Sequence, residues 1–153
     1  MSKRDIPFAR PILGNTERSA VDLILQGHVL VHGPLIHEFE KHFSNWTDAK
    51  SAIAVSSCTA GLHLAYFSLG IGQGDEVIVP AMSHVATAHA VEYVGAKPIF
   101  VDAEHRTGNI DIEQIESAIT EKTKAISIVH YLGMPVDMDR INSIAETYNI
   151  LVI

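Results

Sequence analysis

Short apolar runs alternate with helical patterns along the last two thirds of the chain. Runs typical of buried strands cover residues 52–56, 76–80, 98–102, 125–130 and 150–153. Each of the first four is followed by residues with the spacing of a helix before the next run begins. Short apolar strands that alternate with helices are typical of a mostly parallel sheet covered on both faces. The pattern therefore predicts an α/β fold with three layers, α-β-α.

Two of these helices show recognisable starts or buried faces. Asp111 and Gln114 have the spacing of a capping pair and predict a helix start. This helix would bury Ile112, Ile115 and Ile119. The helix after Pro135 would pack through Met138, Ile141, Ala145 and Tyr148. Both stripes have the spacing that a helix needs to cover a sheet.

The first 50 residues follow a different pattern. Prolines and a glycine predict an extended arm over residues 1–15. Thr16 can cap a first helix that stops at Gly27. The packing face of that helix would be Val21, Ile24 and Leu25, and a second helix would pack through Ile36, Phe39 and Phe43. We therefore divide one predicted domain, residues 1–153, into an arm with helices (1–50) and a sheet-containing part (51–153).

Composition and charge limit the classes of function. With 153 residues, 47% of them hydrophobic, the chain is long enough for one domain with a sizeable core. The net charge of −7 argues against a nucleic-acid or anionic-membrane surface. The single cysteine, Cys58, cannot form an internal disulfide, and the N-terminus lacks the apolar core of a signal peptide. No apolar run is long enough to span a bilayer, and the nine histidines form no metal-binding motif. We expect a soluble, cytoplasmic protein without a metal site.

Small polar residues follow the first apolar run. In an open α/β sheet, ligands bind outside the carboxyl ends of the strands. Ser57, Cys58 and Thr59 lie at such an end and begin a helix, where hydroxyls and free backbone N–H groups favour an anion such as phosphate. The alternative, which the pattern alone favours, is that they only cap a helix of the core. No dinucleotide-binding fingerprint and no nucleoside-triphosphate loop is present.

Further polar residues follow the other runs. His84 either enters a helix as a solvated or backbone-bonded side chain, or lies flat against a planar ligand. Asp102 closes the third run and has the character of a solvated turn residue. His130 ends the fourth run and is equally compatible with a ligand-lining and a structural role.

A series of segments, in order along almost the whole chain, resembles one family of enzymes. They are residues 33–34, 39–40, 56–65, 69–80, 95–102, 123–126 and 130–139. The chain resembles the sugar aminotransferases of the DegT/DnrJ/EryC1/StrS family, which use pyridoxal 5'-phosphate (PLP) in the aspartate-aminotransferase fold. The resemblance implies the N-terminal part of the PLP-binding large domain of a fold type I transferase.

The resemblance also implies roles for individual residues. The segment 56–65 is similar to the phosphate-binding segment of the family, so Cys58 and Thr59 would hold the PLP phosphate, with Ser57 alongside. His84 falls where family members usually carry an aromatic residue that stacks on the pyridine ring, and histidine there departs from the commonest choice. The implied substrates are nucleotide-linked keto sugars, with glutamate or glutamine as amino donor. The implied assembly is a homodimer.

The last apolar run ends with the chain, and we expect a truncated larger protein. In the family, the Schiff-base lysine and the aspartate that pairs with the pyridinium nitrogen would lie beyond residue 153, so the chain alone should be inactive. Three alternatives remain open. They are a PLP-dependent sugar dehydratase of the same family, a non-catalytic short paralogue that binds a partner subunit, and a phosphate-binding α/β domain unrelated to PLP.

Overall fold

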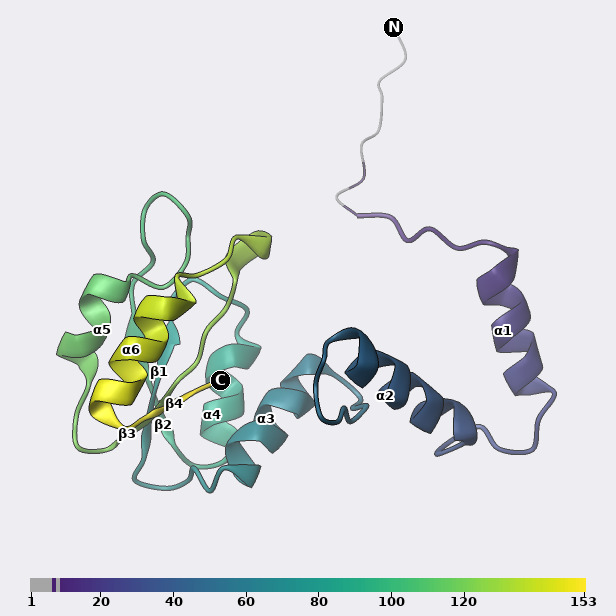
Figure 1. Cartoon of the computed structure of the whole chain (residues 1–153), viewed down its shortest axis with the longest axis horizontal. Helices are drawn as coiled ribbons and strands as arrows, with labels where there is room; N and C mark the ends of the chain where they lie inside the picture. Colours follow the sequence, from purple (N-terminus) through teal and green to yellow (C-terminus); the bar gives the residue numbers. More distant parts are fainter. Residues whose placement is uncertain (1–6, 8) are drawn as a thin grey trace, which may run out of the picture. The chain divides into compact units, whose positions relative to one another are not determined.

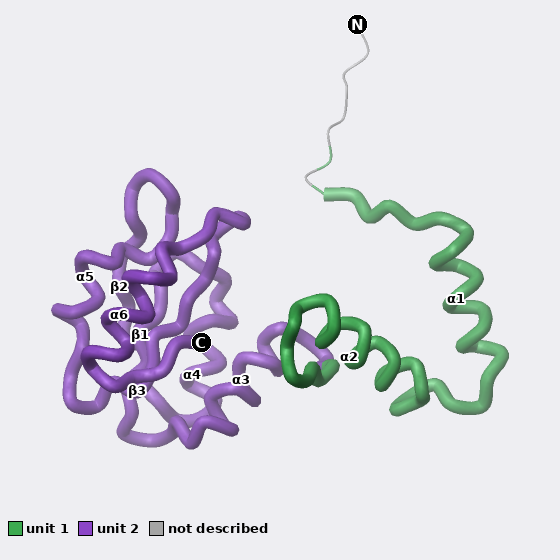
Figure 2. The backbone as a smooth tube through the Cα atoms, viewed as in Figure 1, with its two compact units in different colours: residues 1–54 green, residues 55–153 purple. Residues whose placement is uncertain are grey.

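The apolar run at residues 76–80 is buried at every position and lies inside a parallel sheet. The computed structural model describes residue 7 and residues 9–153. The chain forms two compact units, residues 1–54 and residues 55–153, which are described separately (Figure 2).

The second unit is built on a four-stranded sheet with the order β2-β1-β3-β4, in which all neighbouring strands are parallel (Figure 1). The strands are β1 (Glu76–Pro80), β2 (Lys97–Val101), β3 (Thr123–Ile126) and β4 (Leu151–Val152). The helices are α3 (Cys58–Ser68), α4 (Ala86–Tyr93), α5 (Ile112–Ala118) and α6 (Met138–Tyr148), and a short 3-10 turn, η1 (Tyr131–Gly133), follows β3. The predicted α/β class with a parallel sheet is confirmed.

Side chains of β1 alternate between two hydrophobic cores, one on each face of the sheet. Val77 and Val79 pack with residues of α3 and α4, whereas Ile78 packs with residues of α5 and α6. The connection from β1 to β2 runs in one direction across the sheet, and the next two connections run in the other. Right-handed crossovers therefore place α4 on one face and α5 and α6 on the opposite face, which gives the three layers.

Helix ends agree with the expectations at one position and differ at another. Asp111 caps α5 as predicted, since its carboxylate accepts the Glu113 N–H at 3.1 Å and the Gln114 side-chain amide at 2.6 Å. The predicted cap at Thr16 is wrong because the helix begins at Asn15, two residues earlier than a Thr16 cap requires, and Gly14 is its N-cap. There the Glu17 carboxylate accepts the Gly14 N–H at 2.6 Å and replaces a hydroxyl cap.

The strand predicted at residues 52–56 does not form, and this prediction is wrong. Among the described residues the segment pairs with no strand, and Ile53 and Val55 are 79% and 41% exposed. The Ala54 N–H donates instead to the Glu40 carboxylate at 2.8 Å. An apolar run favours a strand only where a sheet edge accepts its backbone hydrogen bonds.

Tyr148, which we predicted to pack against the sheet, is 42% exposed in the last turn of α6.

The first unit contains α1 (Asn15–Leu25) and α2 (Pro34–Trp46). Both helices lie at their predicted places, and the rings of Phe39, Phe43 and Trp46 follow one another at centroid distances of 6.1 Å. Within its described part only Ser44 is buried, so the apolar stripes of both helices are largely exposed to solvent.

Candidate functional site

The loops that follow β1, β2 and β3 leave the sheet at one end because the strands are parallel. Connections from β1 and β3 leave in opposite directions, so the carboxyl ends of these neighbours form the switch point where open α/β sheets bind ligands. A short connection joins α3 to the amino end of β1, so α3 runs back along the sheet and begins toward the carboxyl edge. The residues predicted to bind a ligand therefore belong to segments that face this carboxyl edge.

The start of α3 offers hydrogen-bond donors suited to an anion. Ser57 is the N-cap, and its Oγ accepts the Ala60 N–H at 3.1 Å. The backbone N–H groups of Cys58 and Thr59 have no acceptor within residues 7 and 9–153. Such free groups carry the positive end of the helix dipole. Cys58 is exposed and Thr59 is half-buried, so this first turn is accessible. Ser57 acts as the cap that the simpler interpretation expected, and two amides remain available for an anion.

His84 lies between β1 and α4, and its side chain is bonded to the backbone. Its Nδ1 accepts the Ala86 N–H at 3.1 Å, and the side chain is exposed. Next to it, the Ser83 and Thr87 hydroxyls are 2.7 Å apart. The backbone-bonded alternative for His84 is present, and the bond holds the imidazole at the start of α4 on the same face of the sheet as α3.

The two other edge residues make local contacts. The Asp102 carboxylate accepts the N–H of the following residue at 2.7 Å, as expected for an exposed turn residue. The His130 Nδ1 accepts the Val136 N–H at 3.1 Å, which ties the two ends of the β3–α6 loop together. This hydrogen bond is a structural contact of His130, and a ligand-lining role stays a prediction.

The loops after β2 and β3 are joined by one buried side chain that the sequence did not single out. Asn109 is 5% exposed, and its Oδ1 accepts the Tyr131 N–H at 2.8 Å. Its Nδ2 donates to the Met134 and Pro135 carbonyls at 3.1 and 3.3 Å. Both loops lie at the same end of the sheet in Figure 1. An asparagine in a polar loop has the appearance of a solvated turn residue, and no sequence signal marks its partners 22 to 26 residues away.

The β2–α5 loop is also stabilised from within. The Glu104 carboxylate accepts the Thr107 hydroxyl at 2.7 Å and the N–H groups of Arg106 and Thr107. The hydrogen bond from the Thr107 hydroxyl, followed by that from the Arg106 N–H, lowers the pKa of Glu104 below its ordinary value. The loop is closed at its base by an antiparallel bridge between Ala103 and Ile110.

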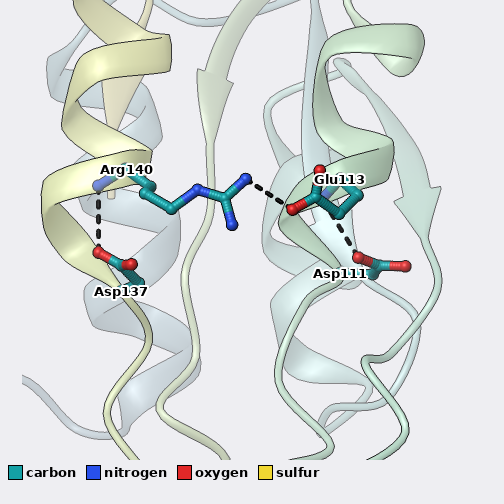
Figure 3. A network of polar contacts seen from close by, with 4 residues as sticks. All are labelled: Asp111, Glu113, Asp137 and Arg140. Atoms are coloured by element: carbon teal, nitrogen blue, oxygen red, sulfur yellow. Dashed lines mark hydrogen bonds and ion pairs between the residues drawn. The ribbon is translucent and has the colours of Figure 1, made fainter.

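A polar network occupies the opposite face of the sheet, between α5 and α6 (Figure 3). The Arg140 guanidinium donates to Glu113 at 2.8 Å, and Asp111 and Asp137 cap the two helices. This hydrogen bond from Arg140 to Glu113 raises the pKa of Arg140. Its charge is already matched by these carboxylates, so the network joins two helices and does not resemble an anion site.

Two other classes of site, a membrane span and a metal centre, are absent from residues 7 and 9–153. No helix there is long and apolar enough to cross a bilayer. No three side chains of histidine, cysteine, aspartate or glutamate lie together in that part of the chain in a way that suits a metal ion.

Solved structures of known proteins share this fold. One is a sugar aminotransferase, described as putative, Spr1654 from Streptococcus pneumoniae in its PLP form, with 36% identity over 97% of this chain and a TM-score of 0.92. Another is NtdA from Bacillus subtilis with bound pyridoxamine phosphate (PMP), with 35% identity over 99% of this chain and a TM-score of 0.86. A third is a 3-amino-5-hydroxybenzoic acid synthase, with 32% identity over 97% and a TM-score of 0.90.

The similarity has a defined extent. This chain covers 38%, 37% and 39% of the lengths of those three proteins. The structures with PLP and PMP show that the family uses pyridoxal phosphate. The family model for the DegT/DnrJ/EryC1/StrS aminotransferases matches residues 11–153. The chain belongs to the DegT/DnrJ/EryC1/StrS aminotransferase family.

Proposed function

We propose that the chain supplies the phosphate-binding and ring-contacting part of a PLP-dependent sugar aminotransferase. The observation that carries the proposal is the first turn of α3, where the Cys58 and Thr59 N–H groups are free of protein acceptors and Ser57 caps the helix beside them. A phosphate dianion suits two free amides, a threonine hydroxyl and the positive end of a helix dipole. The donors present therefore fit the phosphate of PLP.

Each residue has a distinct role in this proposal. Cys58 and Thr59 bind the phosphate through their N–H groups, and the Thr59 hydroxyl adds a third donor. Ser57 orients the turn because its Oγ is engaged by Ala60. His84 contacts the pyridine ring, with its imidazole oriented by the hydrogen bond from Ala86 to Nδ1. When bound, PLP supplies the electron sink that amino-group transfer requires.

For the whole protein we propose transfer of an amino group from glutamate or glutamine to a nucleotide-linked keto sugar, by a cytoplasmic homodimer. The family and the sugar aminotransferase among the similar structures support this substrate class. Mass spectrometry would detect an amino sugar nucleotide after incubation of the whole protein with glutamate and a nucleoside-diphosphate keto sugar. Sedimentation of the whole protein should give twice the mass of one subunit, and a monomer at all concentrations would contradict the dimer.

The cofactor proposal is tested most directly with PMP, which carries the same phosphate and ring as PLP. PMP is an amine, so it cannot condense with surface lysines and obscure a specific site. We expect calorimetry to show one PMP site, with affinity about tenfold weaker in Thr59→Ala, because a hydrogen bond to a charged group is lost. Inorganic phosphate should compete with PMP.

The matched control is Thr147→Ala. It removes the same atoms from an exposed threonine of α6, whose hydroxyl donates only to Ser143 O. Its PMP affinity should equal that of the wild type. Equal affinities in Thr59→Ala and the wild type would refute the assigned phosphate site, and the absence of PMP binding to the wild-type chain would refute the cofactor proposal itself.

A further inference from the structure

The Asn109 side chain connects two loops across the end of the strand that leads to His84. In the order β2-β1-β3, the strands β2 and β3 flank β1. Asn109 follows β2 and holds the backbone of the β3–α6 loop at Tyr131, Met134 and Pro135. The two loops therefore meet over the carboxyl end of β1, the strand whose continuation carries His84.

Packing at the neighbouring glycine shows that the β1 continuation takes part in this contact. A Cβ placed on Gly108 would lie 2.8 Å from Cδ1 of the Tyr131 ring and 3.6 Å from the Met82 sulfur. The Tyr131 ring thus rests on the backbone of Gly108, and Met82 lies against the same point. Met82 precedes His84 by two residues, so the three loops form one packed unit beside the candidate ring-binding position.

From this arrangement we infer that Asn109 is a positioning residue for the ring of the cofactor. Through its three hydrogen bonds it fixes the Tyr131 loop, and through the contact of Tyr131, Gly108 and Met82 it fixes the segment that presents His84. The inference rests on the proposed function, because the ligand is the pyridine ring of PLP or PMP. Asn109 itself is 5% exposed and acts only through its neighbours.

The inference separates the two ends of the ligand. The phosphate position is set by the first turn of α3, and the three side-chain hydrogen bonds of Asn109 all go to the β3–α6 loop. Loss of the Asn109 contacts should therefore lower the affinity for the ring and leave the affinity for phosphate unchanged. A merely structural residue would lower both affinities together, through loss of folded protein.

The test is the isosteric variant Asn109→Asp. It keeps an acceptor for the Tyr131 N–H but replaces the two donations to Met134 and Pro135 by repulsion between oxygens. The matched control is Asn142→Asp, the same change at an exposed asparagine of α6. Calorimetry with PMP gives the affinity for phosphate and ring together, and competition by inorganic phosphate gives the affinity for phosphate alone. Hydrogen exchange reports the loop amides of Gly133, Met134 and Val136.

In Asn109→Asp we expect exchange at the loop amides to accelerate and PMP affinity to fall, each by a factor of about ten, the equivalent of one lost hydrogen bond. The inhibition constant of phosphate should stay at the wild-type value, and Asn142→Asp should match the wild type in every measurement. Unchanged PMP affinity in Asn109→Asp, or equal losses for PMP and phosphate, would overturn the inference. So would an unfolded variant, because Asn109 would then support the fold as a whole.

Failure of the proposed function is recognised separately. It appears as a wild-type chain that does not bind PMP, before any variant is compared. Failure of the inference requires a wild type that binds PMP. It then appears as an Asn109→Asp variant that binds PMP equally well, that has lost affinity for phosphate to the same extent, or that is unfolded.

Discussion

Replacing Tyr66 by phenylalanine should destabilise the second unit through the loss of one buried hydrogen bond. The Tyr66 side chain is 0% exposed, and its hydroxyl donates to Ser127 Oγ at 3.0 Å. The variant keeps the ring in its core and leaves the Ser127 hydroxyl, 2% exposed, without this partner. A stranded buried hydroxyl costs about 1–3 kcal/mol, and the free energy of unfolding should fall by that amount.

A double-mutant cycle separates the bond from the packing. Ser127→Ala strands the phenol and should cost about as much as Tyr66→Phe. The double variant leaves neither hydroxyl stranded, so its loss should be smaller than the sum of the two single losses by about 1 kcal/mol. The free energies come from urea unfolding followed by far-ultraviolet circular dichroism, because Trp46 lies in the first unit and would report on that unit by fluorescence.

The cycle has a second signature in its pH dependence. Burial raises the pKa of the Tyr66 phenol above its ordinary value of 10.0, and the hydrogen bond with Ser127 opposes this effect. A group whose pKa is raised in the folded state stabilises the fold fully below its unfolded pKa and loses that contribution as the pH rises through the folded pKa. The stability of the wild type relative to Tyr66→Phe should therefore decline above pH 10. A pH-independent difference would show that burial does not perturb the phenol, and a coupling energy near zero would show that the two hydroxyls do not pair.

Two further predictions concern the β2–α5 loop. Gly108→Ala should lower the free energy of unfolding in urea by about 1–3 kcal/mol, because the added methyl group would lie 2.8 Å from the Tyr131 ring and the residue adopts φ +74°. Gly70→Ala is the control, since Gly70 has the same φ of +74° but open space around it. Equal losses in the two variants would show that the methyl group does not collide with the Tyr131 ring. The pKa of Glu104 is lowered chiefly by the Thr107 hydroxyl, so its contribution to stability is present above the unfolded pKa of 4.5 and is lost as the pH falls through the lowered folded value. Glu104→Gln should flatten this acid dependence in urea unfolding, and an unchanged slope would refute the role of the carboxylate.

The sequence predicts the second unit well because its pattern states which side chains are buried. Strand runs separated by amphipathic helices require a covered parallel sheet, and β1 is buried at all five positions. The pattern does not state which strand finds a neighbour. Residues 52–56 are as apolar as β1, but their amides meet no sheet edge among the described residues, and Ala54 turns to Glu40 instead. Which strands pair is decided when the sheet assembles, and local composition does not predict it.

The candidate site also has residues that the sequence marks and one that it does not. The sequence can mark Ser57, Cys58 and Thr59 as candidates because a helix start is a local feature, and helix starts bind anions for local reasons. No local signal marks Asn109, because its hydrogen-bond partners Tyr131, Met134 and Pro135 reach it only after β3 has added to the far side of β1. Contacts between loops that follow different strands depend on the order of the strands in the sheet, and sequence spacing does not predict them.

The strand order also determines the sequence in which the second unit can assemble on the ribosome. β1 and β2 are joined through α4 alone, so this pair can close once residue 101 has emerged. β3 then has to add to the opposite side of β1, and the contacts of Tyr66 with Ser127 and of Asn109 with Tyr131 have to wait for it. Until then the second edge of β1 presents unpaired amides and carbonyls, the feature that makes nascent parallel sheets prone to wrong pairing. From the emergence of β2 to that of β3, this edge of β1 therefore has no partner strand.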